Sequence, residues 1–371
     1  MRLPFYLTRL SGAEPDPSSL TINDIFDGDN KEYVCIFNYM LDPEWLFSEC
    51  PALLTIPVLI CHGQKSLESV LIENVVSSRV DLGAETYGSH HTKMMIIFYS
   101  NGIRIAIGTA NLVEGDWSTK TQGFYVQDFP LLSHNSDHTT TTTTTTTTNN
   151  TYNNDYMNDL SDYLKEIKLY SSFTQKVLTD KVINRLPLYD YSSAYAILMP
   201  SVPGRHKVYN TPYSTSTSAT TTSNTNSTQS STRIGINKWG HFKLKSALDY
   251  YYNHLNTHPT TTTSSSSTSS TTPSSSSSDI NILNTEILEN HTFIQCSSLG
   301  SLTKNEAYIT ELTSSMKATK EKLKFIWPTV ETVRNSLEGY NAGTSIPCDS
   351  KNMYEDYPAN KRLKPFFRDN M

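Results

Sequence analysis

The residues best suited to chemistry lie in and just after one short segment, Ser89-His90-His91-Thr92-Lys93. Lys93 follows His91 by two residues, Asn111 follows Lys93 by eighteen, and Gln122 follows Asn111 by eleven. A neutral imidazole is a competent nucleophile, while ammonium and carboxamide groups donate hydrogen bonds to phosphate oxygens. The set predicts attack on a phosphodiester, in line with the leaving group, with electrostatic stabilisation of the equatorial oxygens and no metal ion.

Two apolar runs follow this segment and predict the strands that position it. Residues 93–99 (KMMIIFY) and 103–109 (IRIAIGT) are separated by a short turn that contains Asn101-Gly102. Asn-Gly is the strongest short signal for a β-hairpin. We therefore expect two antiparallel strands joined by a tight turn.

The expected hairpin brings the candidate residues to one end of the sheet. Residues two apart in a strand point to the same side, so His91 and Lys93 share a face. A fold-back centred on Asn101-Gly102 pairs residues whose numbers sum to about 203. This register sets Asn111 opposite Thr92 and within reach of His91.

The remaining periodicity predicts a mixed α/β layered fold. The continuous apolar run at residues 53–61 is typical of a buried strand, and the stripe of apolar residues over 155–170 is typical of an amphipathic helix. Further strands are expected at residues 195–200 and 324–328, and a further helix at 242–252.

Composition limits the protein to a globular chain with inserts. The chain has 371 residues, a net charge of −6 and 37% hydrophobic residues, so it supports packed cores but not bulk electrostatic coating of nucleic acid. Five scattered cysteines without a CxxC pair argue against a zinc or disulfide framework, and no metal or other cofactor is expected. Three tracts of Ser, Thr and Asn, residues 139–151, 214–232 and 260–278, are expected to be disordered inserts.

A second HxK triplet occurs at His241-Phe242-Lys243. It lies in the predicted helix 242–252, and no Thr-x-Asn follows it on a second strand, so we expect a buried or capping role instead of a catalytic one. Trp45, Trp117 and Trp239 are expected to be core residues.

The chain resembles the tyrosyl-DNA phosphodiesterase family of the phospholipase D superfamily. The resemblance covers nearly the whole chain outside the three tracts. It rests on a series of segments that occur in the same order as in the family. They include Phe5-Tyr6-Leu7-Thr8-Arg9, Phe37-Asn38-Tyr39, His90-His91-Thr92-Lys93-Met94-Met95, Thr109-Ala110-Asn111-Leu112, Asp116-Trp117, Lys120-Thr121-Gln122-Gly123, Pro203-Gly204-Arg205, Trp239-Gly240-His241-Phe242, Ser297-Ser298-Leu299-Gly300-Ser301-Leu302 and residues 328–340.

The resemblance implies a role for each candidate residue. His91 would be the nucleophile that forms a phosphohistidine, Lys93 and Asn111 would hold the phosphate, and Gln122 would support them. Aromatic and polar residues would line the DNA groove: Tyr39, Tyr87, Ser298, Gly300, Ser301 and Ser345.

The resemblance also implies a second half of the active site. In the family, a second HxK and an Asn follow the segment that matches Glu338-Gly339-Tyr340, whereas no histidine occurs here after His291. We therefore expect one full phospholipase D-like α-β-α domain at residues 1–195, an incomplete second domain of the same kind at 196–371, and a chain truncated at its C-terminus.

The function expected from these observations is metal-independent hydrolysis of 3′-phosphotyrosyl and related 3′ adducts of DNA in repair, in the nucleus. The expected partners are single- or double-stranded DNA ends and topoisomerase-derived peptide adducts, with no membrane. Two alternatives stay open: a catalytically inactive DNA-end-binding remnant, and a phospholipase, which the lack of a basic amphipathic segment disfavours.

Overall fold

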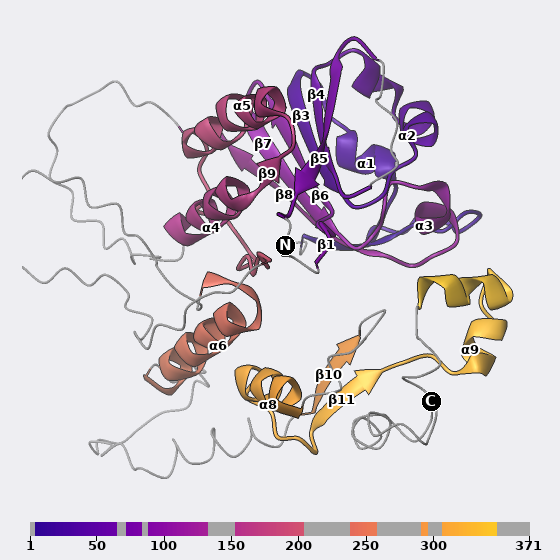
Figure 1. The fold of residues 1–371 in the computed structure, drawn as a ribbon, viewed down its shortest axis with the longest axis vertical. Helices are drawn as coiled ribbons and strands as arrows, with labels where there is room; N and C mark the ends of the chain where they lie inside the picture. The colour runs from indigo at the N-terminus through magenta and orange to yellow at the C-terminus, as the bar shows by residue number, and fades with distance from the viewer. Residues whose placement is uncertain are drawn as a thin grey trace, which may run out of the picture. The chain divides into compact units, whose positions relative to one another are not determined.

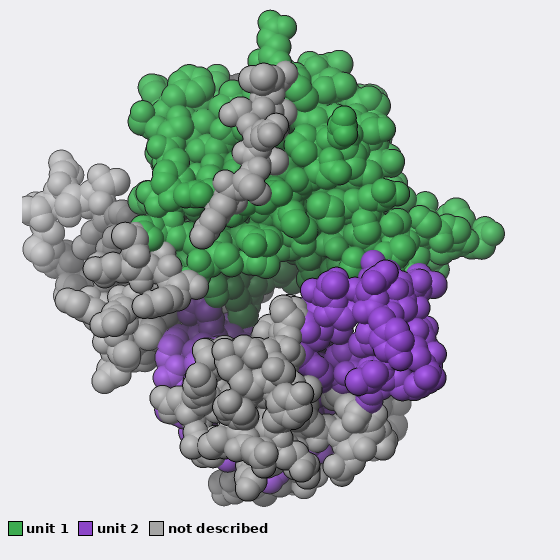
Figure 2. Space-filling view, turned by 45° about the vertical axis from the view of Figure 1, so that its right-hand side comes forward, with its two compact units in different colours: residues 1–205 green, residues 206–371 purple. Residues whose placement is uncertain are grey.

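The computed structural model describes residues 4–64, 72–83, 88–132, 153–203, 238–257, 291–295 and 306–346. The chain divides into two compact units, residues 1–205 and 206–371, which Figure 2 colours green and purple. The three Ser/Thr/Asn tracts lie outside the described residues. Each unit is described by itself.

Unit 1 is built on a mixed nine-stranded sheet (Figure 1). In spatial order its strands are β2 (Ser19–Leu20), β1 (Phe5–Thr8), β8 (Gly123–Pro130), β7 (Gly102–Gly108), β6 (Met94–Tyr99), β3 (Lys31–Asn38), β4 (Val58–His62), β5 (Val75–Asp81) and β9 (Lys168–Leu169). β3, β4 and β5 are mutually parallel, and β6, β7 and β8 form an antiparallel meander. The predicted α/β class is confirmed.

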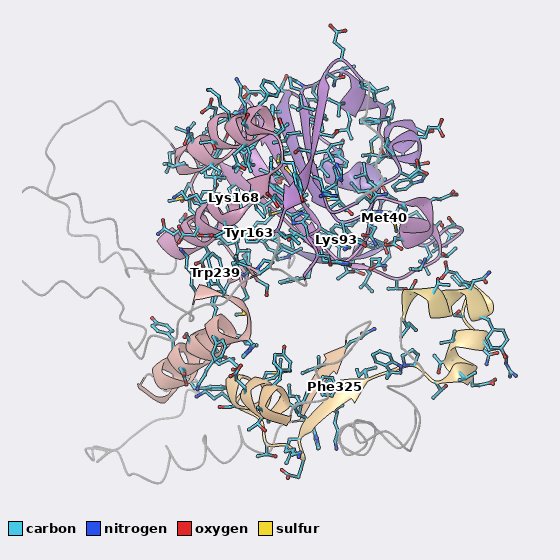
Figure 3. The ribbon with its side chains drawn as sticks, in the orientation of Figure 1. Met40, Lys93, Tyr163, Lys168, Trp239 and Phe325 are labelled. Carbon is cyan, nitrogen blue, oxygen red and sulfur yellow. The ribbon has the colours of Figure 1, made fainter. Side chains whose placement is uncertain are left out.

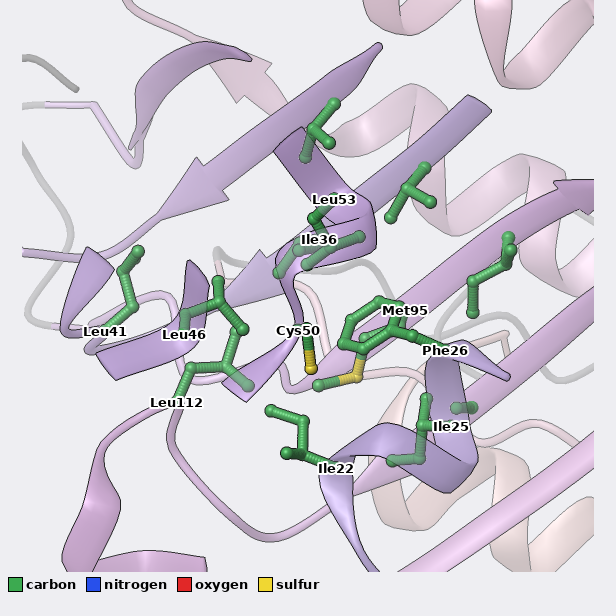
Figure 4. Close-up of a cluster of buried hydrophobic side chains, with 14 of the residues drawn as sticks. Ile22, Ile25, Phe26, Ile36, Leu41, Leu46, Cys50, Leu53, Met95 and Leu112 are labelled. Atoms are coloured by element: carbon green, nitrogen blue, oxygen red, sulfur yellow. The ribbon is translucent and has the colours of Figure 1, made fainter. Parts of the chain in front are cut away.

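One face of this sheet carries the main core. Apolar residues from α1 (Ile22–Phe26), α2 (Pro43–Glu49), the 3₁₀ helix η1 (Pro51–Leu54) and α3 (Glu114–Ser118) pack on alternate residues of β3, β4 and β6. Figure 4 shows part of this cluster, with Ile36 and Met95 from the sheet facing Ile25, Leu46 and Leu53. A side-chain cap marks the start of α2: Asp42 accepts a hydrogen bond from the backbone N–H of Trp45, and Pro43 occupies the first turn.

The opposite face is covered by α4 (Asn153–Glu166), α5 (Ser172–Lys181) and the 3₁₀ helix η2 (Ile183–Leu188). Phe129 of β8 packs on Tyr156 of α4, and Phe98 of β6 packs on Tyr189, which directly follows η2. The sheet is therefore buried on both sides, which explains why β4 and β6 consist entirely of buried residues. The sheet and its two helical layers position the HxK segment, which leads directly into β6.

Four sequence predictions need correction in unit 1. The strand predicted at 53–61 begins only at Val58, because Pro51 starts a 3₁₀ turn and Pro57 has no N–H to donate to a ladder. The helix predicted over 155–170 ends at Glu166, and Lys168–Leu169 then pairs with β5. Residues 195–200 form no strand, because they pair with no strand of the sheet.

The fourth correction concerns the hairpin. β6 and β7 do pair antiparallel, but Tyr99 faces Gly102 and Met94 faces Ile107, so paired numbers sum to 201 instead of 203. The two-residue loop is Ser100-Asn101, and Gly102 already belongs to β7, where an added Cβ would lie 2.7 Å from the carbonyl oxygen of Phe129. Asn111 is consequently not opposite Thr92 and lies beyond the end of β7.

Unit 2 contains α6 (Gly240–Thr257), α8 (Glu306–Ser315), α9 (Val330–Arg334), the 3₁₀ helix η5 (Gly339–Ser345) and two parallel strands, β10 (Thr292–Gln295) and β11 (Leu323–Ile326). Ile309, Leu323 and Phe325 form its buried cluster. The predicted helix at 242–252 is confirmed within α6, and the predicted strand at 324–328 corresponds to β11.

The second HxK triplet lies on α6, as expected. His241 contacts two residues of α8: its Nδ1 is 2.9 Å from Ser315 Oγ, and its Nε2 is 3.2 Å from Glu311 Oε1. The histidine therefore tethers one helix to another. Trp117 and Trp239 are buried and Trp45 packs against the core of unit 1, which confirms the expected core roles.

Candidate active site

His91 and Lys93 are in direct contact at the entry to β6. Lys93 Nζ lies 3.5 Å from His91 Nδ1 and donates a hydrogen bond to the His91 carbonyl oxygen at 3.1 Å. The Lys93 backbone carbonyl accepts a hydrogen bond from the Gly108 N–H at 2.9 Å, which ties this segment to the end of β7. Lys93 is buried, whereas His91 is exposed (Figure 3 labels Lys93).

Tyr39 covers one face of the His91 ring. The two ring centroids are 4.0 Å apart with an interplanar angle of 17°, and Lys93 Nζ is 6.0 Å from the Tyr39 ring centroid. Tyr39 directly follows β3, the neighbour of β6 in the sheet. The stack fixes the plane of the imidazole while the ring remains accessible to a ligand.

The ionisation of the site favours a neutral imidazole beside a cation. Partial desolvation of its ring lowers the pKa of His91 below its ordinary 6.5, and the neighbouring Lys93 charge lowers it further. Burial also lowers the pKa of Lys93, and the negative charge of Asp116 opposes that effect. His91 is therefore in its nucleophilic form at neutral pH.

Asn111 is held by α3. Its backbone N–H and its Nδ2 both donate to Asp116 Oδ2, at 2.7 and 2.9 Å, and its carbonyl oxygen accepts from Trp117 Nε1 at 2.8 Å. Asp116 also acts electrostatically on Lys93. Asn111 thus belongs to the same cluster as Lys93, although it reaches it through Asp116 and not through the predicted strand register.

Gln122 lies just before β8 and is fixed by two threonines. Its Oε1 accepts from Thr109 Oγ1, and its backbone N–H donates to Thr8 Oγ1 at 2.9 Å. Thr109 Oγ1 in turn accepts from the Gly123 N–H at 3.0 Å. The ends of β1, β7 and β8 are thereby joined beside the HxK segment, with Gln122 two strands away from it.

A cavity of about 750 Å³ adjoins the HxK segment within unit 1. His91, Thr92 and Lys93 line it together with mainly apolar side chains from β1, β8, α4 and the segment that replaces the predicted strand at 195–200. Thr92 itself turns toward α4 and hydrogen-bonds the Tyr163 hydroxyl. The HxK segment therefore separates two environments, the polar cluster around Asp116 and the apolar cavity.

The other predicted groove residues divide into two groups. Tyr87, Ser298, Gly300 and Ser301 lie outside the described residues. Ser345 is exposed at the end of η5 in unit 2.

Sequence analysis missed two residues that shape the cluster, Asp116 and Gly63. Asp116 follows Asn111 by five residues and starts the Asp116-Trp117 pair, and this short spacing before a helical turn was the available signal. Gly63 lies against Tyr39 and the His90 backbone, and nothing in the sequence except its position directly after β4 indicated this role.

Among the described residues, no group of three or more His, Cys, Asp or Glu side chains could hold a metal ion. Cys35, Cys50 and Cys61 are free and buried. No helix in the described part of the chain is both long and apolar enough to cross a bilayer.

Comparison with known proteins supports one family. The family profile described as tyrosyl-DNA phosphodiesterase matches residues 4–368. Tyrosyl-DNA phosphodiesterase 1 of Arabidopsis thaliana is 30% identical over 358 residues, covering 92% of this chain and 47% of the relative. The Drosophila melanogaster enzyme of the same name is 28% identical over 216 residues, covering 54% of this chain and 34% of the relative. The chain thus spans at most about half the length of these two relatives.

The fold agrees with this assignment. A crystal structure of a yeast tyrosyl-DNA phosphodiesterase variant superposes with a TM-score of 0.54 at 11% identity, covering 98% of this chain and 73% of that one. The large mixed sheet flanked by helices is therefore the fold of that enzyme. On the profile match and the sequence identity together, the chain belongs to the tyrosyl-DNA phosphodiesterase family.

Proposed function

We propose that this protein cleaves phosphodiesters that join a tyrosyl or related adduct to the 3′ end of DNA. The observation that carries the proposal is the contact of a buried Lys93 with an exposed His91 whose pKa is lowered. A neutral imidazole beside a fixed cation is the arrangement that in-line attack on an anionic phosphodiester requires.

The reaction would proceed in two displacements. A His91 ring nitrogen bonds to phosphorus as the bond from phosphorus to the tyrosyl oxygen breaks, and the phenolate leaves with the electron pair. Because a phenol has a pKa of about 10, it departs more readily than an alkoxide would. Water then breaks the phosphorus–nitrogen bond and releases a 3′-phosphate.

The neighbouring groups would bind the phosphate. Lys93 and Asn111 would donate to its non-bridging oxygens. Gln122, which is hydrogen-bonded to Thr109, would support the site from the neighbouring strand ends. The adjoining apolar cavity suits the aromatic ring of a tyrosyl leaving group, since ligand pockets combine apolar walls with a few polar groups.

The remaining assignments rest on family membership. The DNA strand would be contacted through hydroxyl, amide and stacking interactions, which do not depend on the base sequence. The residues expected to make these contacts are Tyr39, Tyr87, Ser298, Gly300, Ser301 and Ser345. Residues 196–371 would form a partial second phospholipase D-like domain, and the protein would act in the nucleus, where its substrate is found.

The test uses the purified 371-residue chain and an oligonucleotide with a 3′-phosphotyrosine, in the presence of EDTA, with products resolved on a denaturing gel. We expect release of the 3′-phosphate that His91→Ala abolishes. Residues 292–371 contain no histidine, so that stretch supplies no second histidine to assist hydrolysis of the intermediate. Accumulation of a protein-linked band would show that hydrolysis of the phosphohistidine is the slow step. Binding of the oligonucleotide without release or adduct would favour the DNA-end-binding alternative.

A further inference from the structure

Asp116 is hydrogen-bonded to Asn111 and paired with Lys120. Its Oδ2 accepts both the backbone N–H and the Nδ2 of Asn111, and its Oδ1 lies 3.5 Å from Lys120 Nζ. The side chain is almost fully buried, at 9% exposure. A buried carboxylate with this many partners is a fixed element of the site.

The contact determines which way the Asn111 carboxamide faces. An ionised carboxylate only accepts hydrogen bonds, so the nitrogen of the carboxamide, and not its oxygen, must face Asp116. A flipped amide would place Oδ1 against the carboxylate oxygen. Since Trp117 also holds the Asn111 carbonyl, α3 fixes both backbone and side chain of this residue.

This orientation leaves part of the Asn111 amide available. The second hydrogen on Nδ2 is not needed by Asp116, and Oδ1 is buried with no hydrogen-bond partner in the described part of the chain. Buried polar atoms are nearly always satisfied, so an unsatisfied acceptor indicates a place for a bound donor. A bound water offers that donor, because a phosphodiester carries no proton to give; the phosphate is instead the acceptor for the second Nδ2 hydrogen.

Asp116 also provides the negative charge that opposes neutralisation of Lys93. Other ionisable groups near Lys93 are His90 and His91 on its own segment and Tyr39 after β3, while Lys120 pairs with Asp116 itself. Both histidines have lowered pKa values and are uncharged where a lysine titrates. Asp116 is therefore the anionic member of this set.

We propose that Asp116 is a positioning residue of the reaction: it orients the Asn111 amide toward the phosphate and supplies the negative charge that acts on Lys93. The inference rests on the proposed function. It also predicts properties of the ligand-free chain, so the two can fail separately.

Two variants separate the effects of Asp116. Asp116→Ala removes both the acceptor and the charge, and because misplacement of a binding group by 1 Å can cost about 10²-fold, we expect a loss of that order in the single-turnover rate on the 3′-phosphotyrosyl oligonucleotide. Asp116→Asn keeps an acceptor for Asn111 and loses the charge, so its rate should fall less. Its upper pH limit should shift downward, because Lys93 loses its proton at lower pH.

The matched control is Glu114→Ala, an exposed acidic residue on the same helix, which should leave rate and pH profile unchanged. Thermal melting identifies variants that only unfold, because loss of folded protein lowers the rate without moving the pH limit. Independently of activity, NMR titration of Lys93 should show a lower midpoint in Asp116→Asn than in the unaltered chain. An unchanged Lys93 midpoint together with an unchanged pH limit overturns the inference, whereas an inactive unaltered chain with a shifted midpoint counts only against the proposed function.

Discussion

Tyr39 lies flat against His91, with ring centroids 4.0 Å apart and planes inclined by 17°. Tyr39 is itself confined from behind by Gly63: a Cβ at that position would lie 2.7 Å from Tyr39 Cδ2 and 2.6 Å from the His90 carbonyl oxygen. The His91 ring is therefore stacked on Tyr39, and the backbone at Gly63 lies close against the Tyr39 ring. This relationship assigns Tyr39 to the support of His91 as well as to the groove predicted from the sequence.

Removal of the stacked ring should affect His91 more than removal of the Tyr39 hydroxyl. Aromatic pairs contribute about 0.5–1.5 kcal/mol beyond burial, so Tyr39→Ala should lower the single-turnover rate by about three- to tenfold. Tyr39→Phe retains the stacking surface and should stay near the rate of the unaltered chain. Equal losses in both variants would show that the hydroxyl, and not the stack, is what His91 needs.

Gly63→Ala should be destabilising, because neither the His90 backbone nor the Tyr39 ring can move freely away from the new methyl group. Overpacking of this kind costs about 1–3 kcal/mol in the free energy of unfolding, measurable by urea denaturation. Gly123→Ala is the matched control, since nothing lies within 4 Å of its Cβ position. A loss of similar size at Gly123 would mean that backbone freedom, and not the close approach, explains the result.

The lowered pKa of His91 can be measured directly. NMR titration of its ring should give a midpoint below 6.5, so the neutral form persists to lower pH than in an ordinary histidine. Lys93→Met removes the neighbouring cation and should raise that midpoint toward 6.5. A midpoint that does not rise in Lys93→Met would contradict the electrostatic role given to this lysine.

His90 should make stability depend on pH. Burial, followed by the charges of Lys93, His91 and His62, lowers its pKa to about 4 from 6.5. The unfolded chain therefore binds more protons between these values, so stability is full above pH 6.5 and is lost as pH falls toward 4, by about 3 kcal/mol.

Urea denaturation between pH 4 and 7 tests this expectation. His90→Gln should flatten the pH dependence without removing it, because the pKa of buried His62 is also lowered by burial. An identical pH dependence in the variant would show that His90 is not buried in its neutral form.

The proximity of His91 and Lys93 could be predicted from the sequence, because residues two apart in an extended segment lie close together. The strand itself begins later than predicted, at Met94, so both residues precede β6. The position of Asn111 depends on where the turn falls: a two-residue turn at Ser100-Asn101 instead of Asn101-Gly102 lowers the sum of paired residue numbers from 203 to 201. Asp116, a carboxylate on α3, hydrogen-bonds Asn111 and acts electrostatically on Lys93, and no local pattern specifies this arrangement.

The expected strand at 195–200 failed for a related reason. The apolar run at 195–200 predicts an extended chain, but a strand also requires a ladder partner, which no local pattern specifies. The rejection of His241-Phe242-Lys243 succeeded because helical periodicity over residues 242–252 is a local property.

The most direct test of the account is to find where phosphorus becomes attached to the protein. The chain is mixed with a 3′-phosphotyrosyl oligonucleotide, quenched at alkaline pH to preserve phosphohistidine, digested, and analysed by mass spectrometry. The account predicts an oligonucleotide phosphate on the peptide that contains His91, absent from His91→Asn. Release of the 3′-phosphate at an unchanged rate by His91→Asn, or an adduct on another residue, would contradict it.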